Sequence, residues 1–175
     1  MIPESTRTFE NLNAALAGEA RLAFLYRLWA ERAQADGQYA TAQLFDTTAK
    51  NEISHARLWY HILHDQASDT LENLNRAAGL EKTEWSESYA TFARVAREEG
   101  FDDVAVQFDL VAGIEAQHEQ RYRQQLSDLQ SGAATHAPGA EWICQECGYH
   151  VTADDAPQTC PVCGKGAGWF GKKGC

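Results

Sequence analysis

Apolar and polar residues follow a helical pattern along four long stretches of the chain, and a turn signal closes each of them. Gly37 and Gly100 mark the ends of the first and third stretches, because glycine commonly lies just past a helix end. The Asp69-x-x-Glu72 spacing resembles a capping box that opens the third. The expected helices run from about Thr8 to Ala35, Tyr39 to His64, the Asp69 cap to Glu99, and Asp102 to Gln130. Long helices with short connections predict an all-α, antiparallel four-helix bundle.

The pattern changes after the fourth helix. Residues 131–140 are small, uncharged at neutral pH and without periodicity, which is typical of a linker. Residues 141–175 are too few to fold on a hydrophobic core of their own, so this unit needs additional stabilisation such as a bound metal. We therefore expect a helical bundle at residues 1–130, a linker at 131–140 and a small C-terminal metal domain at 141–175.

The helical region contains an internal repeat. The run Asn-Leu-Asn-x-Ala-x-x-x-Glu at residues 11–19 recurs at residues 73–81, an offset of 62. The run Phe-Asp-x-x-Ala-x-x-Glu-x-x-His at residues 45–55 recurs at 108–118, an offset of 63 that Gly37 and Gly100 share. Two helical hairpins thus carry the same polar set, with one glutamate on the first helix and Glu-x-x-His on the second.

The repeated polar residues are candidate metal ligands. Glu-x-x-His places both side chains on one helix face, a turn apart. A single such pair most often lies on a solvated helix face, but a verbatim duplicate with a matched glutamate on each preceding helix favours metal. Carboxylates in a bundle core would be very costly unless they bind cations. The candidates are Glu19, Glu52, His55, Glu81, Glu115 and His118. Four carboxylates and two imidazoles can hold two metals with Glu52 and Glu115 bridging, as in ferritin-like di-iron proteins, and suit iron or manganese.

Glu84 breaks the repeat, because its equivalent in the first hairpin is the apolar Leu22. It is either a solvated glutamate or a fifth carboxylate that makes the two metal positions unequal. Tyr26 and Tyr89 lie about two turns beyond the glutamate on the first helix of each hairpin. They either donate hydrogen bonds to these ligands or are ordinary core tyrosines.

All five cysteines lie in the last 32 residues. Cys-x-x-Cys-Gly at residues 144–148 and Cys-Pro-x-Cys-Gly at 160–164 form two matching knuckles, which favour a metal over disulfides. The four thiolates expected to bind one metal tetrahedrally are Cys144, Cys147, Cys160 and Cys163. The spacing fits zinc as well as iron. Cys175 lies outside the pattern and is expected to be an inert terminal thiol.

Four aromatic residues, Trp142, Tyr149, Trp169 and Phe170, accompany these cysteines. They are expected either to shield an iron site from water or to form the small core that any metal here would need. Four histidines fall outside the ligand pattern and are expected at the surface or in packing: His61, His64, His136 and His150.

Composition narrows the class of protein. A chain of 175 residues with 44% hydrophobic residues has room for one packed domain and an appendage. The net charge of −10 argues against nucleic acid, which needs basic patches. No apolar run is long enough to cross a bilayer, and the first residues do not resemble a signal peptide. The expected location is the cytoplasm, where thiols stay reduced.

The chain resembles the rubrerythrin family along nearly its full length. The matching motifs are Ala-Gly-Glu at residues 17–19, Glu-x-x-His-Ala at 52–56, Glu-x-x-Glu at 81–84, Ala-Arg-Glu-Glu-Gly-Phe at 96–101, Glu-x-x-His-Glu-x-Arg-Tyr at 115–122, and the rubredoxin-like tail. The resemblance implies a ferritin-like di-iron bundle with a C-terminal rubredoxin-like domain. It also implies an NAD(P)H-linked peroxidase that defends against oxidative stress by reducing hydrogen peroxide to water.

Carried over by position, the resemblance adds Glu84 to the six repeated residues as a ligand of two iron ions, exchanging with His55 at one of them. The four knuckle cysteines would hold a third iron, or zinc in recombinant material. Electrons would come from a reductase or a rubredoxin that the sequence does not identify. We expect a homodimer in which the tail of one subunit approaches the bundle of the other.

Three alternatives stay open. Iron oxidation and storage, as in ferritin, needs no electron-carrying tail. A zinc-ribbon interaction module on a structural bundle would be colourless. A di-iron oxygen reductase is chemically the nearest alternative.

Overall fold

The computed structural model describes residues 2–64 and 69–173. It divides into two compact units, Met1–Ser68 and Asp69–Cys175. Two expectations concern residues outside the described part of the chain, namely the connection at residues 65–68 and the inert thiol of Cys175. The division into residues 1–130, 131–140 and 141–175 stays a prediction.

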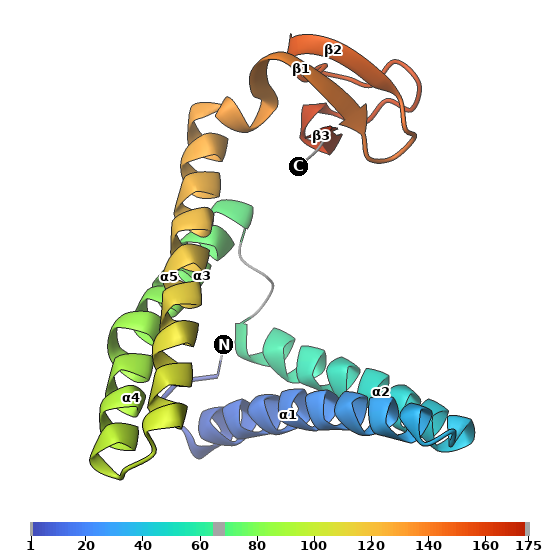
Figure 1. Ribbon diagram of the computed structural model, residues 1–175. Coiled ribbons are helices and arrows are strands. Elements are labelled where there is room, and N and C mark those ends of the chain that lie inside the picture. The colour runs from blue at the N-terminus through green and yellow to red at the C-terminus, as the bar shows by residue number, and fades with distance from the viewer. Residues whose placement is uncertain (1, 65–68, 174–175) are drawn as a thin grey trace. The chain divides into compact units, whose positions relative to one another are not determined.

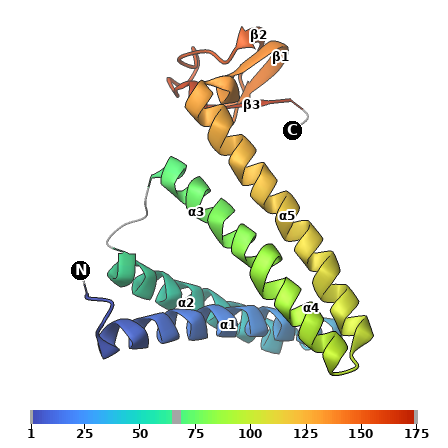
Figure 2. The ribbon, with the colours of Figure 1, turned by 90° about the vertical axis from the view of Figure 1, so that its left-hand side faces the viewer.

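The first unit is a helical hairpin of α1 (Arg7–Ala35) and α2 (Tyr39–His64), which lie side by side in Figures 1 and 2. The Thr6 side chain caps α1 by accepting a hydrogen bond from the Phe9 backbone N–H at 3.2 Å. Between the helices the chain reverses at Gly37, whose φ of +74° favours glycine. The predicted limits of both helices are confirmed to within one residue.

The second unit begins with a hairpin whose first arm is not one uninterrupted α-helix, as the sequence pattern had suggested. This arm consists of α3 (Thr70–Thr83), a π-helical turn η1 (Glu84–Ser88) and α4 (Tyr89–Glu98). The second arm is α5 (Asp102–Ser131), which runs alongside both helices in Figures 1 and 2. The predicted start of this helix is confirmed, since the Asp69 side chain caps it by accepting from the Glu72 backbone N–H at 2.9 Å.

Small residues bring the two helices of each hairpin together. The buried residues of the helices are almost all alanines, and three pairs of them repeat at the offset of 63: Ala30 and Ala93, Ala33 and Ala96, Ala42 and Ala105. Large apolar side chains stay exposed instead, including Phe24 and Leu44 in the first hairpin and Leu80 and Leu110 in the second. Each hairpin therefore lacks a core of large side chains within itself.

The C-terminal part of the second unit is a small antiparallel sheet in the order β2-β1-β3. Its elements are η2 (Ala133–Thr135), β1 (His136–Cys144), β2 (His150–Asp155), η3 (Ala167–Trp169) and β3 (Phe170–Lys172). Strand β1 begins inside the segment expected to be a linker, because His136 pairs with Asp155 of β2. The core consists of Trp142, Cys144, Ala156, Cys160 and Phe170. The predicted fold class, helical with a small four-cysteine C-terminal domain, is confirmed.

Candidate metal centres

The first hairpin brings together Glu19 from α1 with Glu52 and His55 from α2. One ligand atom from each of the three lies within 4.8 Å of the others. His55 Nδ1 lies 2.8 Å from Glu52 Oε2 and 3.9 Å from Glu19 Oε1. The two carboxylate side chains are 23% and 15% exposed, so they lie largely out of water. Two carboxylates and an imidazole in this arrangement offer oxygen and nitrogen donors to one cation.

The second hairpin repeats this group with Glu81 from α3 and Glu115 and His118 from α5. His118 Nδ1 lies 2.7 Å from Glu115 Oε2 and 3.8 Å from Glu81 Oε2. Each distance is within 0.1 Å of its equivalent in the first hairpin. The duplication seen in the sequence therefore extends to the geometry of the ligand groups, and all six repeated residues fall into one group or the other.

The carboxylates of the second hairpin are electrostatically crowded. Burial raises the pKa of Glu81, and a hydrogen bond with Glu115 and the charges of Glu115 and Glu84 raise it further. Burial also raises the pKa of Tyr89, with the charges of Glu84, Glu115 and Glu81 adding to the shift. Such crowding is unfavourable for ionised carboxylates, and a bound cation would relieve it.

Glu84 lies outside the three-residue ligand group but within electrostatic reach of it. Its charge raises the pKa of both Glu81 and Tyr89. It is the first residue of the π-helical turn η1, where the backbone N–H of Tyr89 donates to the carbonyl of Glu84 across five residues. π-Helical turns are rare and often lie at functional sites. Direct metal ligation by Glu84 stays a prediction.

The π-helical turn accounts for the change in the repeat offset. Glu19 and Glu81 are related by 62 residues, whereas Tyr26 and Tyr89 are related by 63. One residue is therefore inserted between Glu81 and Tyr89, where the structure has η1. In an ordinary α-helix, one inserted residue would rotate the following segment by about 100° about the helix axis. The wider π-helical turn accommodates the extra residue, so α3 and α4 can both keep the same side chains directed toward α5.

Both tyrosines pack against aromatic rings. Tyr26 contacts Trp29 and Phe45 at ring-centroid distances of 5.4 and 6.1 Å. Tyr89 contacts Phe92 and Phe108, each at 6.0 Å. These contacts favour the interpretation as core tyrosines, and burial together with nearby carboxylates raises the pKa of Tyr89.

The four knuckle cysteines form one group, as predicted. The Sγ atoms of Cys144 and Cys163 lie 3.6 Å apart, and so do those of Cys147 and Cys160. Four thiolates at about 2.3 Å from a tetrahedral metal would lie about 3.8 Å apart, so the group fits one iron or zinc ion. Cys144 and Cys160 are buried, whereas Cys147 and Cys163 are exposed.

The surroundings of Cys160 and Cys163 shift the pKa values of these two thiols in opposite directions. Burial acts to raise the pKa of Cys160, but backbone hydrogen bonds from Cys163 and Val162 outweigh it and lower the pKa to about 7. A backbone hydrogen bond from Lys165 favours the Cys163 thiolate, yet burial and the neighbouring thiols together raise its pKa to about 12. The backbone hydrogen bonds to the Cys160 sulfur thus favour its thiolate, the form that binds a metal.

The aromatic residues around the cysteines have different roles. Trp142 and Phe170 belong to the buried core, and the Trp142 indole donates to the Ala153 carbonyl at 3.1 Å. Tyr149 is partly buried against that core. Trp169 is 46% exposed, with Lys165 Nζ 4.1 Å from its ring centroid. No other histidine joins a metal-ligand group among residues 2–64 and 69–173, and His136 instead lies 2.7 Å from Asp155.

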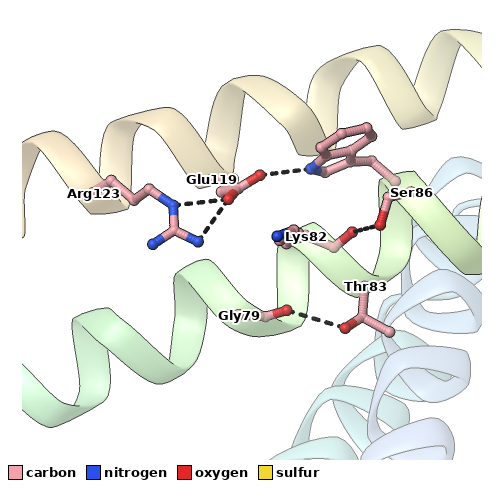
Figure 3. A network of polar contacts seen from close by, with 7 residues as sticks. Gly79, Lys82, Thr83, Ser86, Glu119 and Arg123 are labelled. Carbon is pink, nitrogen blue, oxygen red and sulfur yellow. Dashed lines mark hydrogen bonds and ion pairs between the residues drawn. The ribbon is translucent and has the colours of Figure 1, made fainter.

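Sequence reasoning missed a polar network beside the second ligand group (Figure 3). The Trp85 indole N–H donates to Glu119 Oε2 at 2.7 Å, and Glu119 Oε1 accepts from Arg123 Nε at 2.8 Å and Nη2 at 2.7 Å. The Trp85 hydrogen bond, followed by that of Arg123, lowers the pKa of Glu119. One sequence difference did point to this network: Glu119 is charged, whereas the matching residue of the first hairpin is Ala56.

Comparisons with known proteins find similarity to rubrerythrins along most of the chain. A family model described as "Rubrerythrin" matches residues 10–126, and one described as "Rubrerythrin, rubredoxin-like domain" matches residues 142–170. The rubrerythrin of Porphyromonas gingivalis is 32% identical to this chain, covering 95% of it and 90% of that protein. Rubrerythrin-1 of Clostridium acetobutylicum is 33% identical, covering 91% of each. A solved structure of nigerythrin in a mixed-valence state is 28% identical and covers 97% of this chain and 88% of that one, with a TM-score of 0.38.

Ligand groups for a di-iron site and for a rubredoxin-like four-cysteine site are both present. The predicted cofactors are confirmed to that extent. Within residues 2–64 and 69–173, no helix is both long enough and apolar enough to span a membrane.

Proposed function

We propose that this chain, which belongs to the rubrerythrin family, is a non-haem di-iron peroxidase that reduces hydrogen peroxide to water. Oxidoreductase chemistry is common to the family. The observation that carries the proposal is the pair of matched carboxylate–imidazole groups, one on each hairpin, in a chain that also holds four thiols at tetrahedral spacing. The first set is suited to a pair of hard cations and the second to a one-electron iron centre.

The two ligand groups are proposed to meet when the hairpins pair into a four-helix bundle, with Glu52 and Glu115 between two iron ions. The exposed large apolar side chains of both hairpins support this pairing, because such faces need a partner to leave water. Charge supports it too. The carboxylates of Glu19, Glu52, Glu81 and Glu115 carry four negative charges, which balance the four positive charges of two ferrous ions.

When bound, a pair of ferrous ions would supply the two electrons that reduction of peroxide to two water molecules requires, together with two protons. The residues of the chain hold the ions and control proton positions around them. A tyrosine phenol is protonated at neutral pH, and burial with nearby carboxylates raises the pKa of Tyr89 further, so this phenol is a hydrogen-bond donor near three carboxylates. Glu84 would be the ligand that distinguishes the two metal positions, exchanging with His55.

The four-cysteine centre is proposed to return electrons one at a time. Cys147 and Cys163 are exposed, which gives an electron donor access to one side of the group, while Cys144 and Cys160 are buried in the domain core. The donor would be an NAD(P)H-linked reductase or a rubredoxin. We also propose a homodimer in which one subunit's tail approaches the other's bundle, and a cytoplasmic location, where the thiols stay reduced.

Two rival functions share much of this chemistry. Iron oxidation and storage would use the same carboxylates but gives no role to the four-cysteine domain. An oxygen reductase would use both centres, so only relative rates separate it from a peroxidase.

The test is a metal count followed by reoxidation kinetics. Protein produced with ample iron is expected to hold three irons per chain and to show the visible spectrum of a rubredoxin-type centre. The fully reduced protein is then mixed with peroxide or with oxygen at equal concentrations, and faster reoxidation by peroxide is expected. Faster reoxidation by oxygen would identify an oxygen reductase, and hundreds of irons in a cage-sized assembly would identify a storage protein. A colourless protein that binds only zinc would overturn the redox proposal.

A further inference from the structure

A polar contact between residues far apart in the sequence joins the π-helical turn η1 to α5. The Trp85 indole N–H donates to the Glu119 carboxylate at 2.7 Å, although the two residues are 34 positions apart. The Glu119 side chain is only 12% exposed, and its other oxygen accepts two hydrogen bonds from Arg123. Figure 3 shows Glu119 and Arg123 on α5 facing the segment that carries Lys82 and Ser86.

This network has no counterpart in the first hairpin. At the matching repeat positions, Glu119 is replaced by Ala56 and Arg123 by Tyr60. Trp85 lies within the stretch that contains the inserted residue. The inserted residue, Glu84 and the Trp85–Glu119 contact therefore occur together in one hairpin and are absent together from the other, which indicates that they serve one purpose.

A π-helical turn needs support from its surroundings. Widening the turn disturbs the regular backbone hydrogen bonds, so runs longer than one turn are rare. Two side chains add hydrogen bonds to backbone carbonyls in and next to the turn. Ser86 Oγ donates to the Lys82 carbonyl at 2.7 Å, and Thr83 Oγ1 donates to the Gly79 carbonyl at 3.2 Å. These bonds are local. Among the residues that the structure describes, the Trp85–Glu119 hydrogen bond is the polar contact that fixes the turn against the neighbouring helix, and a hydrogen bond to a partly buried carboxylate is strong.

We propose that Trp85 and Glu119 are positioning residues that hold the π-helical turn and thereby keep Glu84 beside Glu81, where it can serve the iron that also uses His55. This inference rests on the proposed function. Trp85 directly follows Glu84, so fixing its indole against α5 fixes the rotation of the turn about the helix axis. Without the contact, the turn could move its extra residue along the arm, and Glu84 would leave the neighbourhood of Glu81.

The test compares Trp85→Phe with Trp29→Phe. The first removes the N–H donor and keeps an aromatic ring. The second is the same substitution on the other hairpin, at a residue that is 46% exposed and whose repeat equivalent, Phe92, is already phenylalanine. In metal-free full-length protein, amide hydrogen exchange at residues 84–88 is expected to accelerate by roughly tenfold or more in Trp85→Phe and to stay at the parent rate in Trp29→Phe. Glu119→Gln, which keeps an acceptor for the indole, should give an intermediate rate.

A cobalt(II) titration then tests whether the contact acts through Glu84. Trp85→Phe and Glu84→Leu are each expected to weaken the same one of the two bundle sites, and the double variant is expected to be no weaker than Glu84→Leu alone. Exchange rates equal in Trp85→Phe and Trp29→Phe would overturn the inference, and so would additive effects of the two substitutions on cobalt affinity. If instead the proposed function is wrong, the bundle of the parent protein would bind no cobalt, while hydrogen exchange at residues 84–88 would still be faster in Trp85→Phe than in Trp29→Phe.

Discussion

His118 holds its Nδ1 atom 2.7 Å from the carboxylate of Glu115, one helical turn before it on α5. His55 and Glu52 are related in the same way in the other hairpin, at 2.8 Å. In both pairs the imidazole and the carboxylate lie on one helix face and can bind the same cation. This relationship makes the histidines the most direct targets for testing the metal centre.

Replacing His118 with alanine should remove iron from the bundle and spare the four-cysteine centre. The variant loses the nitrogen donor of one ligand group but keeps its helix, because alanine is a strong helix former. Iron per chain is measured together with the visible spectrum, and the expected result is loss of bundle iron with the rubredoxin-type spectrum unchanged. His150→Ala, at an exposed strand residue outside every ligand group, is the control and should retain all its iron.

Replacing Cys144 with serine should abolish electron delivery and unfold residues 141–175. Cys144 is buried in the core of that domain, which is too small to fold without its metal, and structural metal sites in such units contribute about 10–16 kcal/mol. The bundle should still bind iron and react once with peroxide. Steady-state turnover with a reductase measures electron delivery, and a single-turnover reaction with peroxide measures the bundle centre alone. Undiminished steady-state turnover would contradict the role of the centre as an electron carrier.

Replacing Glu84 with leucine, the residue at the matching repeat position, should raise the reduction potential of the bundle centre and slow its reoxidation by peroxide. A carboxylate stabilises the ferric state more than the ferrous state, because the extra positive charge interacts with it more strongly in a low-dielectric core. The helices should stay folded. A redox titration of variant and parent side by side gives the answer, and identical potentials with identical peroxide rates would mean that Glu84 is an ordinary helix-face carboxylate.

Replacing Ala42 with leucine should destabilise the first hairpin by about 1–3 kcal/mol, because a buried alanine at a close helix contact has no room for three more carbon atoms. The melting temperature should fall by several degrees. Ala40→Leu, two residues earlier on α2 and exposed, is the matched control and should melt like the parent. Equal melting temperatures for the two variants would show that the α1–α2 contact tolerates larger side chains.

The sequence alone identified the members of the candidate ligand groups. The duplicated Glu and Glu-x-x-His runs and the two cysteine knuckles identified every member of the three ligand groups, because ligands on a helix face or a knuckle are set by spacing along the chain. Helix ends were predictable for the same reason. Gly37, Gly100 and the Asp69 cap act through their immediate neighbours.

Only the tertiary structure decided the form of the inserted residue and what supports it. The change of offset from 62 to 63 shows in the sequence that one residue is extra, but hydrophobic periodicity does not distinguish an α-turn from a single π-turn. The Trp85–Glu119 contact joins residues 34 positions apart, and the start of β1 at His136 depends on its pairing with Asp155. Both are decided by packing between distant segments, which propensity and spacing along the chain do not encode.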